Sequence, residues 1–160
     1  GVGLARGLRA LGCEAGLKWP NDLLVRGRKI GGILIETLTR EGGETVAMIG
    51  FGVNHGHSAS DLPTPRATSL REEVEQVPNL DSTAGILLRS LALELGNLHD
   101  EVYARREYEE LSVHRRGDRL RCRLGGESVD GTFLGFDHRG FLRLEVEGRE
   151  RVMNAGEVYE

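Results

Sequence analysis

The chain has 160 residues, 39 % of them hydrophobic and 29 % charged, which is typical of a soluble globular protein and excludes a disordered one. The formal net charge of −4 does not suggest a basic nucleic-acid-binding surface, and the apolar runs are too short for a transmembrane helix, so we expect no membrane contact. Two cysteines, Cys13 and Cys122, are too few for a disulfide scaffold, so we expect a reducing, cytoplasmic location.

The first part of the chain is predicted to combine one helix with several strands. Leucines at helical spacing predict a helix over residues 2–11, although Gly3 and Gly7 weaken it. Patterns of β-branched and apolar residues, separated by glycine-containing turns, predict strands over 16–19, 23–25, 29–39 and 45–53, the last as a buried strand. Two successive hairpins predict a mixed or antiparallel sheet.

A long polar loop and a long helix follow. Residues 54–80 are rich in His, Ser, Asp, Pro and Thr, and predict a loop with one helical turn near 69–74. A single helix is then expected from a cap at Ser82 to about Tyr108. Its apolar positions recur every three or four residues, at Ile86, Leu87, Leu88, Leu91, Leu95, Leu98, Val102 and Tyr103.

The pattern changes after Leu111. A basic connector over 112–118 precedes short strand-like runs at 119–124, 128–136, 141–146 and 149–154. Such closely spaced short strands predict a small β-barrel of SH3-like type. We therefore expect an α+β fold with two domains, residues 1–112 and 113–160.

Several chemically suggestive residues have simpler explanations. His55 and His57 lack a second ligand pair, so we predict no metal site there. Cys13 and Cys122 are expected to be structural thiols. The arginines between residues 105 and 123 fit a solvated helix end and linker better than a site for an acidic partner. Two glycine patterns resemble a dinucleotide fingerprint, but neither lies between a strand and a helix.

The segment Lys18–Asp22 is the strongest candidate for chemistry. Lysine occurs at only two of the 21 basic positions, Lys18 and Lys29. The ammonium of Lys18 can meet a carboxylate and then a phosphate, Trp19 can wall a pocket, and Asn21 and Asp22 can bind polar ligand atoms or magnesium. The alternative is a capped turn with a solvent-facing lysine.

Glycines interrupt the two following strands. Gly31 and Gly32 lie within 29–39, and Gly50 and Gly52 precede Asn54 at the end of 45–53. A strand glycine often marks a place where a ligand or another backbone comes close. Together with the Lys18 segment, these residues predict a cleft for a small ligand across the sheet.

The runs KWPNDLL, KIGGILIE, IGFGVN and ATSL, in this order, resemble the biotin protein ligases (biotin–[acetyl-CoA-carboxylase] ligase). The likeness extends over essentially the whole chain. It implies a partial catalytic domain of the class II synthetase-like fold, followed by the SH3-like barrel. It also implies that biotin and Mg²⁺·ATP react to biotinyl-5′-AMP, from which biotin passes to a lysine of biotin carboxyl carrier protein.

The resemblance assigns roles to the candidate residues. Lys18 would be catalytic and would hold both the biotin carboxylate and the α-phosphate. The implied biotin-binding residues are Lys18, Trp19, Gly31, Gly32, Gly50 and Gly52. The implied ATP-binding residues are Lys18, Asn21, Asp22, Lys29 and Asn54. No protein-held metal site is implied.

The family's Thr-Asn-containing biotin contact and its Gly-Arg-Gly-x-x-Gly-Arg loop do not occur in these 160 residues. We therefore expect a fragment that is inactive and poorly stable alone. Two alternatives stay open, a lipoate-type acyl-protein ligase or transferase and a non-catalytic module that binds biotin or the carrier. Homodimerisation is possible by resemblance, and DNA binding would need an N-terminal winged helix.

Overall fold

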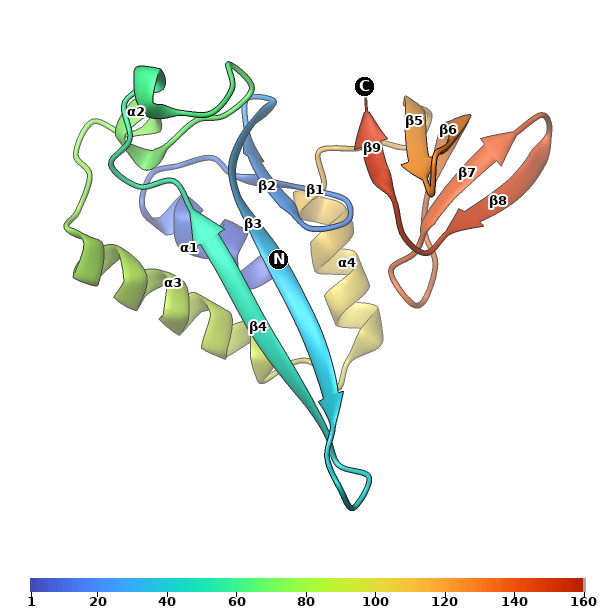
Figure 1. Ribbon diagram of the computed structural model, residues 1–160, viewed down its shortest axis with the longest axis horizontal. Coiled ribbons are helices and arrows are strands. Elements are labelled where there is room, and N and C mark those ends of the chain that lie inside the picture. The colour runs from blue at the N-terminus through green and yellow to red at the C-terminus, as the bar shows by residue number, and fades with distance from the viewer. Residues whose placement is uncertain (160) are drawn as a thin grey trace.

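The computed structural model describes residues 1–159, which fold into two antiparallel sheets with helices packed beside them (Figure 1). The first sheet has strand order β1-β2-β3-β4, with β1 (Gly16–Lys18), β2 (Asp22–Val25), β3 (Arg28–Thr39) and β4 (Thr45–Val53). The second has order β8-β7-β6-β5-β9, with β5 (Arg119–Leu124), β6 (Glu127–Phe136), β7 (Leu142–Val146), β8 (Arg149–Met153) and β9 (Glu157–Tyr159). The helices are α1 (Val2–Ala10), α2 (Leu70–Glu73), α3 (Leu80–Leu95) and α4 (Glu101–Leu111), with a 3₁₀ turn η1 (Ala59–Asp61).

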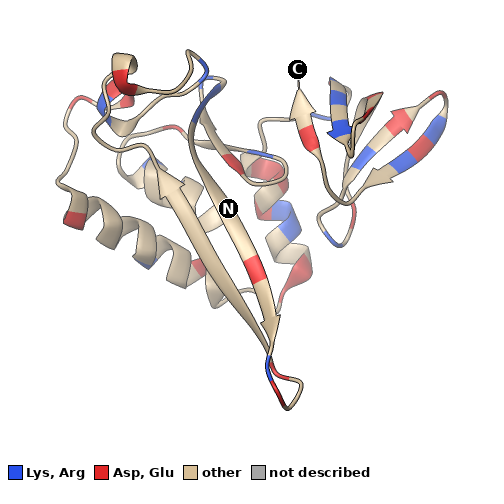
Figure 2. Cartoon of the chain, in the orientation of Figure 1, with Lys and Arg blue, Asp and Glu red and all other residues tan. Residues whose placement is uncertain are grey.

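The first sheet confirms the predicted antiparallel hairpins, but its last strand is not buried. β3 and β4 pair from Gly31↔Val53 to Thr39↔Thr45. Their far halves extend beyond the helices as a two-stranded ribbon (Figure 1), which leaves Leu34, Ile35 and Met48 more than half exposed. Figure 2 shows few charges along this ribbon apart from its turn. The prediction that residues 45–53 form a buried strand is therefore wrong, because burial depends on what covers a strand and not on its apolar composition alone.

The long helix predicted over residues 82–108 is wrong, since the chain forms two helices there. α3 begins after Asn79, whose side chain accepts a hydrogen bond from the Ser82 amide at 2.8 Å. α4 begins after Asp100, which caps the Tyr103 amide in the same way at 2.8 Å. The turn that starts at Gly96 and the Asp100 cap end one helix and start another, although apolar residues continue at helical spacing.

The first hydrophobic core lies where α1, α3 and the first sheet meet. Leu4 and Leu8 of α1 and Leu23 of β2 are fully buried in it. The helical glycines have a packing reason, since a Cβ at Gly3 would come within 2.8 Å of the Cα of Leu91. Gly3 and Gly7 therefore let α1 approach α3 closely, which outweighs their low helix propensity.

A second core lies inside the second sheet and against α4. Phe133 and Phe136 pack there with ring centroids 5.1 Å apart, and Tyr108 of α4 meets Phe136 edge-to-face at 5.0 Å. Tyr108 contacts both cores, so α4 joins the two sheets. Within residues 1–159, no helix has the length and apolar character needed to span a membrane.

Candidate functional site

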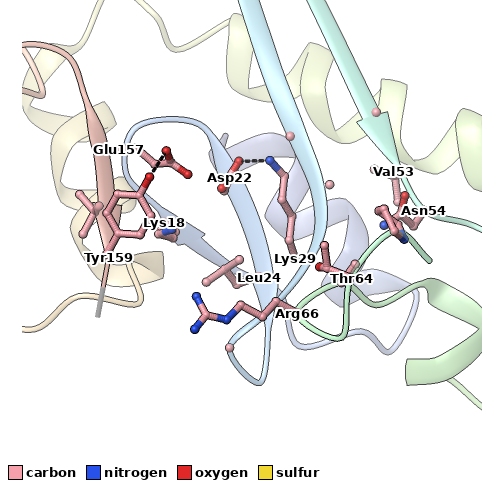
Figure 3. A pocket seen from close by; sticks show the side chains of 17 residues that line it. Lys18, Asp22, Leu24, Lys29, Val53, Asn54, Thr64, Arg66, Glu157 and Tyr159 are labelled. Atoms are coloured by element: carbon pink, nitrogen blue, oxygen red, sulfur yellow. Dashed lines mark hydrogen bonds and ion pairs between the residues drawn. The ribbon is translucent and has the colours of Figure 1, made fainter. Parts of the chain in front are cut away.

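A pocket of about 830 Å³ opens where the first sheet, a loop and the second sheet meet (Figure 3). The polar strand ends of β1 and β2 form one side, the glycine positions of β3 and β4 another, and the loop before α2 and strand β9 complete it. Seven predicted site residues line it: Lys18, Asp22, Lys29, Gly31, Gly32, Gly52 and Asn54. The fold therefore brings together residues that lie up to 36 positions apart in the sequence.

Lys18 ends β1 directly opposite Asp22 in the β1–β2 register. Its side chain is partly buried and lies on the pocket. Within residues 1–159, its ammonium has no hydrogen-bond or ion-pair partner. A partly desolvated cation without a protein counter-ion is suited to receive an anionic ligand group.

The second lysine is held in place by an ion pair. The Nζ of Lys29 lies 2.5 Å from Oδ1 of Asp22, and Figure 3 shows the two side chains reaching toward one another. The Asp22 side chain is about one-fifth exposed, whereas that of Lys29 is half exposed. This pair fixes the start of β2 against β3 and sets the position of a second positive charge beside Lys18.

The glycines in the pocket have different structural reasons. A Cβ at Gly31 would lie 2.4 Å from the carbonyl oxygen of Gly52, so the close approach of β3 and β4 requires glycine there. At Gly52 a Cβ would meet nothing within 4 Å, and at Gly32 its nearest neighbours would be the Lys29 side chain at 3.5 Å and Asp22 at 3.6 Å. The sheet itself therefore needs Gly31, while Gly52 leaves room in the pocket.

This difference predicts that alanine at Gly31 lowers stability, whereas alanine at Gly52 weakens ligand binding. Gly31→Ala is expected to lower the free energy of unfolding by about 1–3 kcal/mol, because the strands must move apart. Gly52→Ala is expected to change it by under about 0.5 kcal/mol and to weaken ligand binding instead. Urea denaturation checks the first effect and calorimetric titration the second. Equal stability of both variants would contradict the packing reason for Gly31.

The loop before α2 is pinned to β3 by backbone hydrogen bonds. The amide of Lys29 donates to the Arg66 carbonyl at 2.7 Å, and the amide of Thr68 donates to the Lys29 carbonyl at 2.8 Å. The Asn54 side-chain amide donates to the Thr68 carbonyl at 2.9 Å. Asn54 thus lines the pocket and also secures the loop that closes it.

A buried carboxylate reinforces this attachment. The Glu73 side chain is 1 % exposed, accepts a hydrogen bond from the Thr68 hydroxyl at 2.6 Å, and pairs with Arg28 at 2.7 Å. Its second oxygen has no hydrogen bond but lies 3.3 Å from a guanidinium nitrogen of Arg26, which makes that contact an ion pair only. Glu73 therefore ties α2 to the β2–β3 turn.

Three predicted site residues lie outside the pocket. Trp19 is 5 % exposed in the second core, and its indole N–H donates to the Gly140 carbonyl at 3.1 Å, so it does not line this pocket. The side-chain amide of Asn21 donates a hydrogen bond to the Ile33 carbonyl at 2.8 Å. Asn21 and Gly50 line a shallower hollow on the neighbouring part of the sheet.

The structure also adds residues that the sequence patterns missed. Thr64 and Arg66 reach the pocket from the loop, and Glu157 and Tyr159 reach it from β9. Arg66 directly precedes the ATSL run at residues 67–70, which is the sequence signal that could have drawn attention to it. No local pattern pointed to β9, because only the packing of the second sheet brings it to Lys18.

The His55 ring has hydrogen-bond partners within the protein. The His55 ring nitrogen Nε2 lies 2.9 Å from the Pro78 carbonyl oxygen and 3.2 Å from the Thr83 hydroxyl, which secures the loop to the start of α3. Burial raises the pKa of the Cys13 thiol to about 11, and that of the Cys122 thiol is raised for the same reason. Both thiols are therefore protonated at neutral pH.

Comparison with known proteins adds sequence relatives. The Biotin/lipoate A/B protein ligase family model matches residues 4–54. The "Biotin--[acetyl-CoA-carboxylase] ligase" of Mycobacterium tuberculosis is 35 % identical over 149 residues, covering 91 % of this chain and 53 % of the relative. The "Bifunctional ligase/repressor BirA" of Escherichia coli is 29 % identical over 165 residues, covering 99 % and 50 %. The chain thus spans about half the length of these relatives.

Solved structures show the same fold. The biotin protein ligase from Aquifex aeolicus, solved in complex with biotin and ATP, has a TM-score of 0.80 at 20 % identity, covering 99 % of this chain and 67 % of that one. Its apo structure gives a TM-score of 0.82 and covers 71 % of that chain. The similarity includes both sheets, since almost the whole chain is superposed.

Proposed function

We propose that the chain provides the biotin- and ATP-binding part of a biotin–protein ligase, because residues 4–54 match the Biotin/lipoate A/B protein ligase family model. The observation that carries the proposal is the pocket beside Lys18. It combines an ammonium without a partner among residues 1–159, a second lysine and two strands with glycines on the pocket. Such a surface can accept a bicyclic ligand that carries a carboxylate, next to a nucleotide.

The proposed reaction has two steps. A biotin carboxylate oxygen attacks the α-phosphorus of ATP, the new O–P bond gives biotinyl-5′-AMP, and the bond to pyrophosphate breaks. The amine of a carrier lysine then attacks the acyl carbonyl, an amide forms, AMP leaves, and the amine loses a proton to solvent. The carrier proposed for this second step is biotin carboxyl carrier protein, in line with the name of the Mycobacterium tuberculosis relative.

Lys18 serves the first step through charge. Two anions, the carboxylate and the α-phosphate, must approach each other, and the ammonium lowers their repulsion as negative charge grows on the phosphate oxygens. Because Lys18 has no counter-ion among residues 1–159, it reaches this state without breaking an ion pair. Lys29 supplies a second positive charge on the nucleotide side.

Magnesium enters this proposal with the nucleotide, as Mg²⁺·ATP. Magnesium prefers oxygen ligands and keeps several waters when it is bound with phosphates. The Asp22 carboxylate, whose Oδ1 pairs with Lys29, and the side-chain carbonyl of Asn54 offer oxygen ligands on the pocket, so these residues fit the ion. The two residues would hold the metal–nucleotide complex beside the lysines.

We also propose that residues 1–112 and 113–160 are separate domains and that the second is an SH3-like barrel. Two hydrophobic clusters support the division, one within residues 1–112 and one formed mostly by residues 113–160. Trp19 crosses it, because its indole belongs to the second cluster although its backbone belongs to the first sheet. The second domain would therefore dock through Trp19 and Tyr108 and bring β9 to the pocket.

A calorimetric titration of the 160-residue chain with biotin, Mg²⁺·ATP, biotinyl-5′-AMP and lipoyl-5′-AMP tests the proposal. We expect biotinyl-5′-AMP to bind at about micromolar concentration and lipoyl-5′-AMP at least about tenfold more weakly. Tighter binding of the lipoyl compound would favour the lipoate-type alternative. No heat with any of the four, from a chain whose circular dichroism shows it folded, would contradict the proposal. Transfer to a carrier domain by this chain, assayed in parallel, would exclude a mere binding module and would contradict the expectation that these 160 residues are inactive alone.

A further inference from the structure

We infer that Arg66 is a further contact to the phosphate chain of the bound nucleotide and so helps determine affinity for ATP. The inference rests on the proposed function. Arg66 lies on the pocket wall formed by the loop, next to the start of β3, and Figure 3 shows its side chain running alongside Leu24 toward the Lys18 side. It would be the third cation on this pocket, after Lys18 and Lys29.

The backbone of Arg66 is unusually well fixed for a loop residue. Its carbonyl accepts the Lys29 amide at 2.7 Å, and the following residue, Ala67, forms a parallel bridge with Lys29. Ala67 in turn donates its amide to the Thr64 carbonyl at 3.0 Å, and prolines occupy positions 63 and 65. The backbones of Arg66 and Lys29 are therefore held side by side.

Side-chain contacts on either side strengthen this anchor. Thr68, two residues after Arg66, is fully buried and donates its hydroxyl to Glu73, which also receives Arg28 from the start of β3. The anchor thus joins the loop and the strand that carries Lys29. The entropy cost of ordering the Arg66 backbone is met in the folded protein, before any ligand binds.

The Arg66 guanidinium is available to a ligand. It is exposed, and within residues 1–159 it has no hydrogen-bond or ion-pair partner. The charged side chains on the pocket are Lys18, Lys29 and Arg66 against Asp22 and Glu157. Because Lys29 and Asp22 pair with each other, Lys18 and Arg66 are the pocket cations without an ion-pair partner among residues 1–159. A planar guanidinium can bind two phosphate oxygens at once, which an ammonium cannot do with the same geometry. A polyphosphate is therefore the ligand group that this arrangement fits.

In the proposed first step, Arg66 would neutralise charge on ATP when it binds and would not touch the biotin carboxylate. Its removal should then weaken binding of ATP and leave binding of biotin and of adenosine unchanged. This selectivity distinguishes a phosphate contact from a general loss of folding. It also distinguishes Arg66 from Lys18, which is proposed to touch both substrates.

The experiment compares Arg66→Gln, Arg66→Lys and a control, Arg89→Gln, which removes the same charge from an exposed position on α3. Titration calorimetry with Mg²⁺·ATP, adenosine and biotin gives the affinities, and thermal unfolding confirms that each variant is folded. We expect Arg66→Gln to bind Mg²⁺·ATP about tenfold more weakly, Arg66→Lys to recover part of the loss, and Arg89→Gln to match the unmodified chain.

Three other results would overturn the inference. If the unmodified chain binds Mg²⁺·ATP and Arg66→Gln binds it equally well, Arg66 is only a solvated loop residue, and the proposed function stands. If Arg66→Gln weakens adenosine and biotin as much as ATP, the residue acts through the loop and not through phosphate. Failure of the unmodified chain to bind ATP at all would overturn both the inference and the proposed function.

Discussion

Lys18→Ala is expected to lower the affinity of the chain for biotinyl-5′-AMP by about 10- to 100-fold. A charge-assisted hydrogen bond contributes about 1.5–3 kcal/mol, and the adenylate offers the Lys18 ammonium both a phosphate and an acyl oxygen. The fold should not change, because this ammonium has no hydrogen-bond or ion-pair partner elsewhere in residues 1–159. Calorimetric titration measures the affinity, and urea denaturation measures the stability.

Lys18→Arg is the informative companion variant. It keeps the charge, but the guanidinium is larger and planar, so it cannot place one nitrogen between two anionic groups as an ammonium does. We expect it to bind the adenylate more weakly than the unmodified chain and more tightly than Lys18→Ala. In a longer form of the protein that catalyses the reaction, Lys18→Arg should strongly slow adenylate formation. If Lys18→Ala bound biotinyl-5′-AMP as tightly as the unmodified chain, the proposed role of Lys18 would be wrong.

Trp19→Ala is expected to lower the free energy of unfolding by about 3–5 kcal/mol, the usual cost of removing a large aromatic side chain from a core. The indole is 5 % exposed, packs in the second core, and donates a hydrogen bond to Gly140 from a turn of the first sheet. Its loss should therefore loosen the attachment between the two sheets as well as the second core. Urea denaturation followed by circular dichroism gives the stability.

A matched variant separates packing from the hydrogen bond. Trp19→Phe keeps most of the aromatic volume and loses only the N–H donor to Gly140, so we expect it to cost about 1–2 kcal/mol. Trp19 is the only tryptophan of the chain, so its fluorescence in the unmodified protein reports the docking of the second sheet directly. A cost below about 1 kcal/mol for Trp19→Ala would contradict its place in the second core.

The sequence by itself determined the local elements and the chemistry of the best-marked segments. The strand at 45–53 has its predicted bounds, and the helical turn near 69–74 is present as α2. Seven of the ten predicted site residues line one pocket, since they sit at the ends or glycine positions of adjacent antiparallel strands. Residue type, alternation and turn glycines act over a few positions, so a reader of the sequence can recover them.

Only the tertiary structure decided what each side chain faces. Trp19 adjoins Lys18 in the sequence, yet it packs into a core formed by residues more than 100 positions later, because burying an indole is favourable wherever an apolar cavity lies within reach. Arg66 and β9 complete the pocket through the packing of a loop and of a second sheet. Gly31 is required by a carbonyl on the neighbouring strand. Such long-range contacts leave no periodic signal in the chain, whereas the strands that carry Lys18 and Lys29 do.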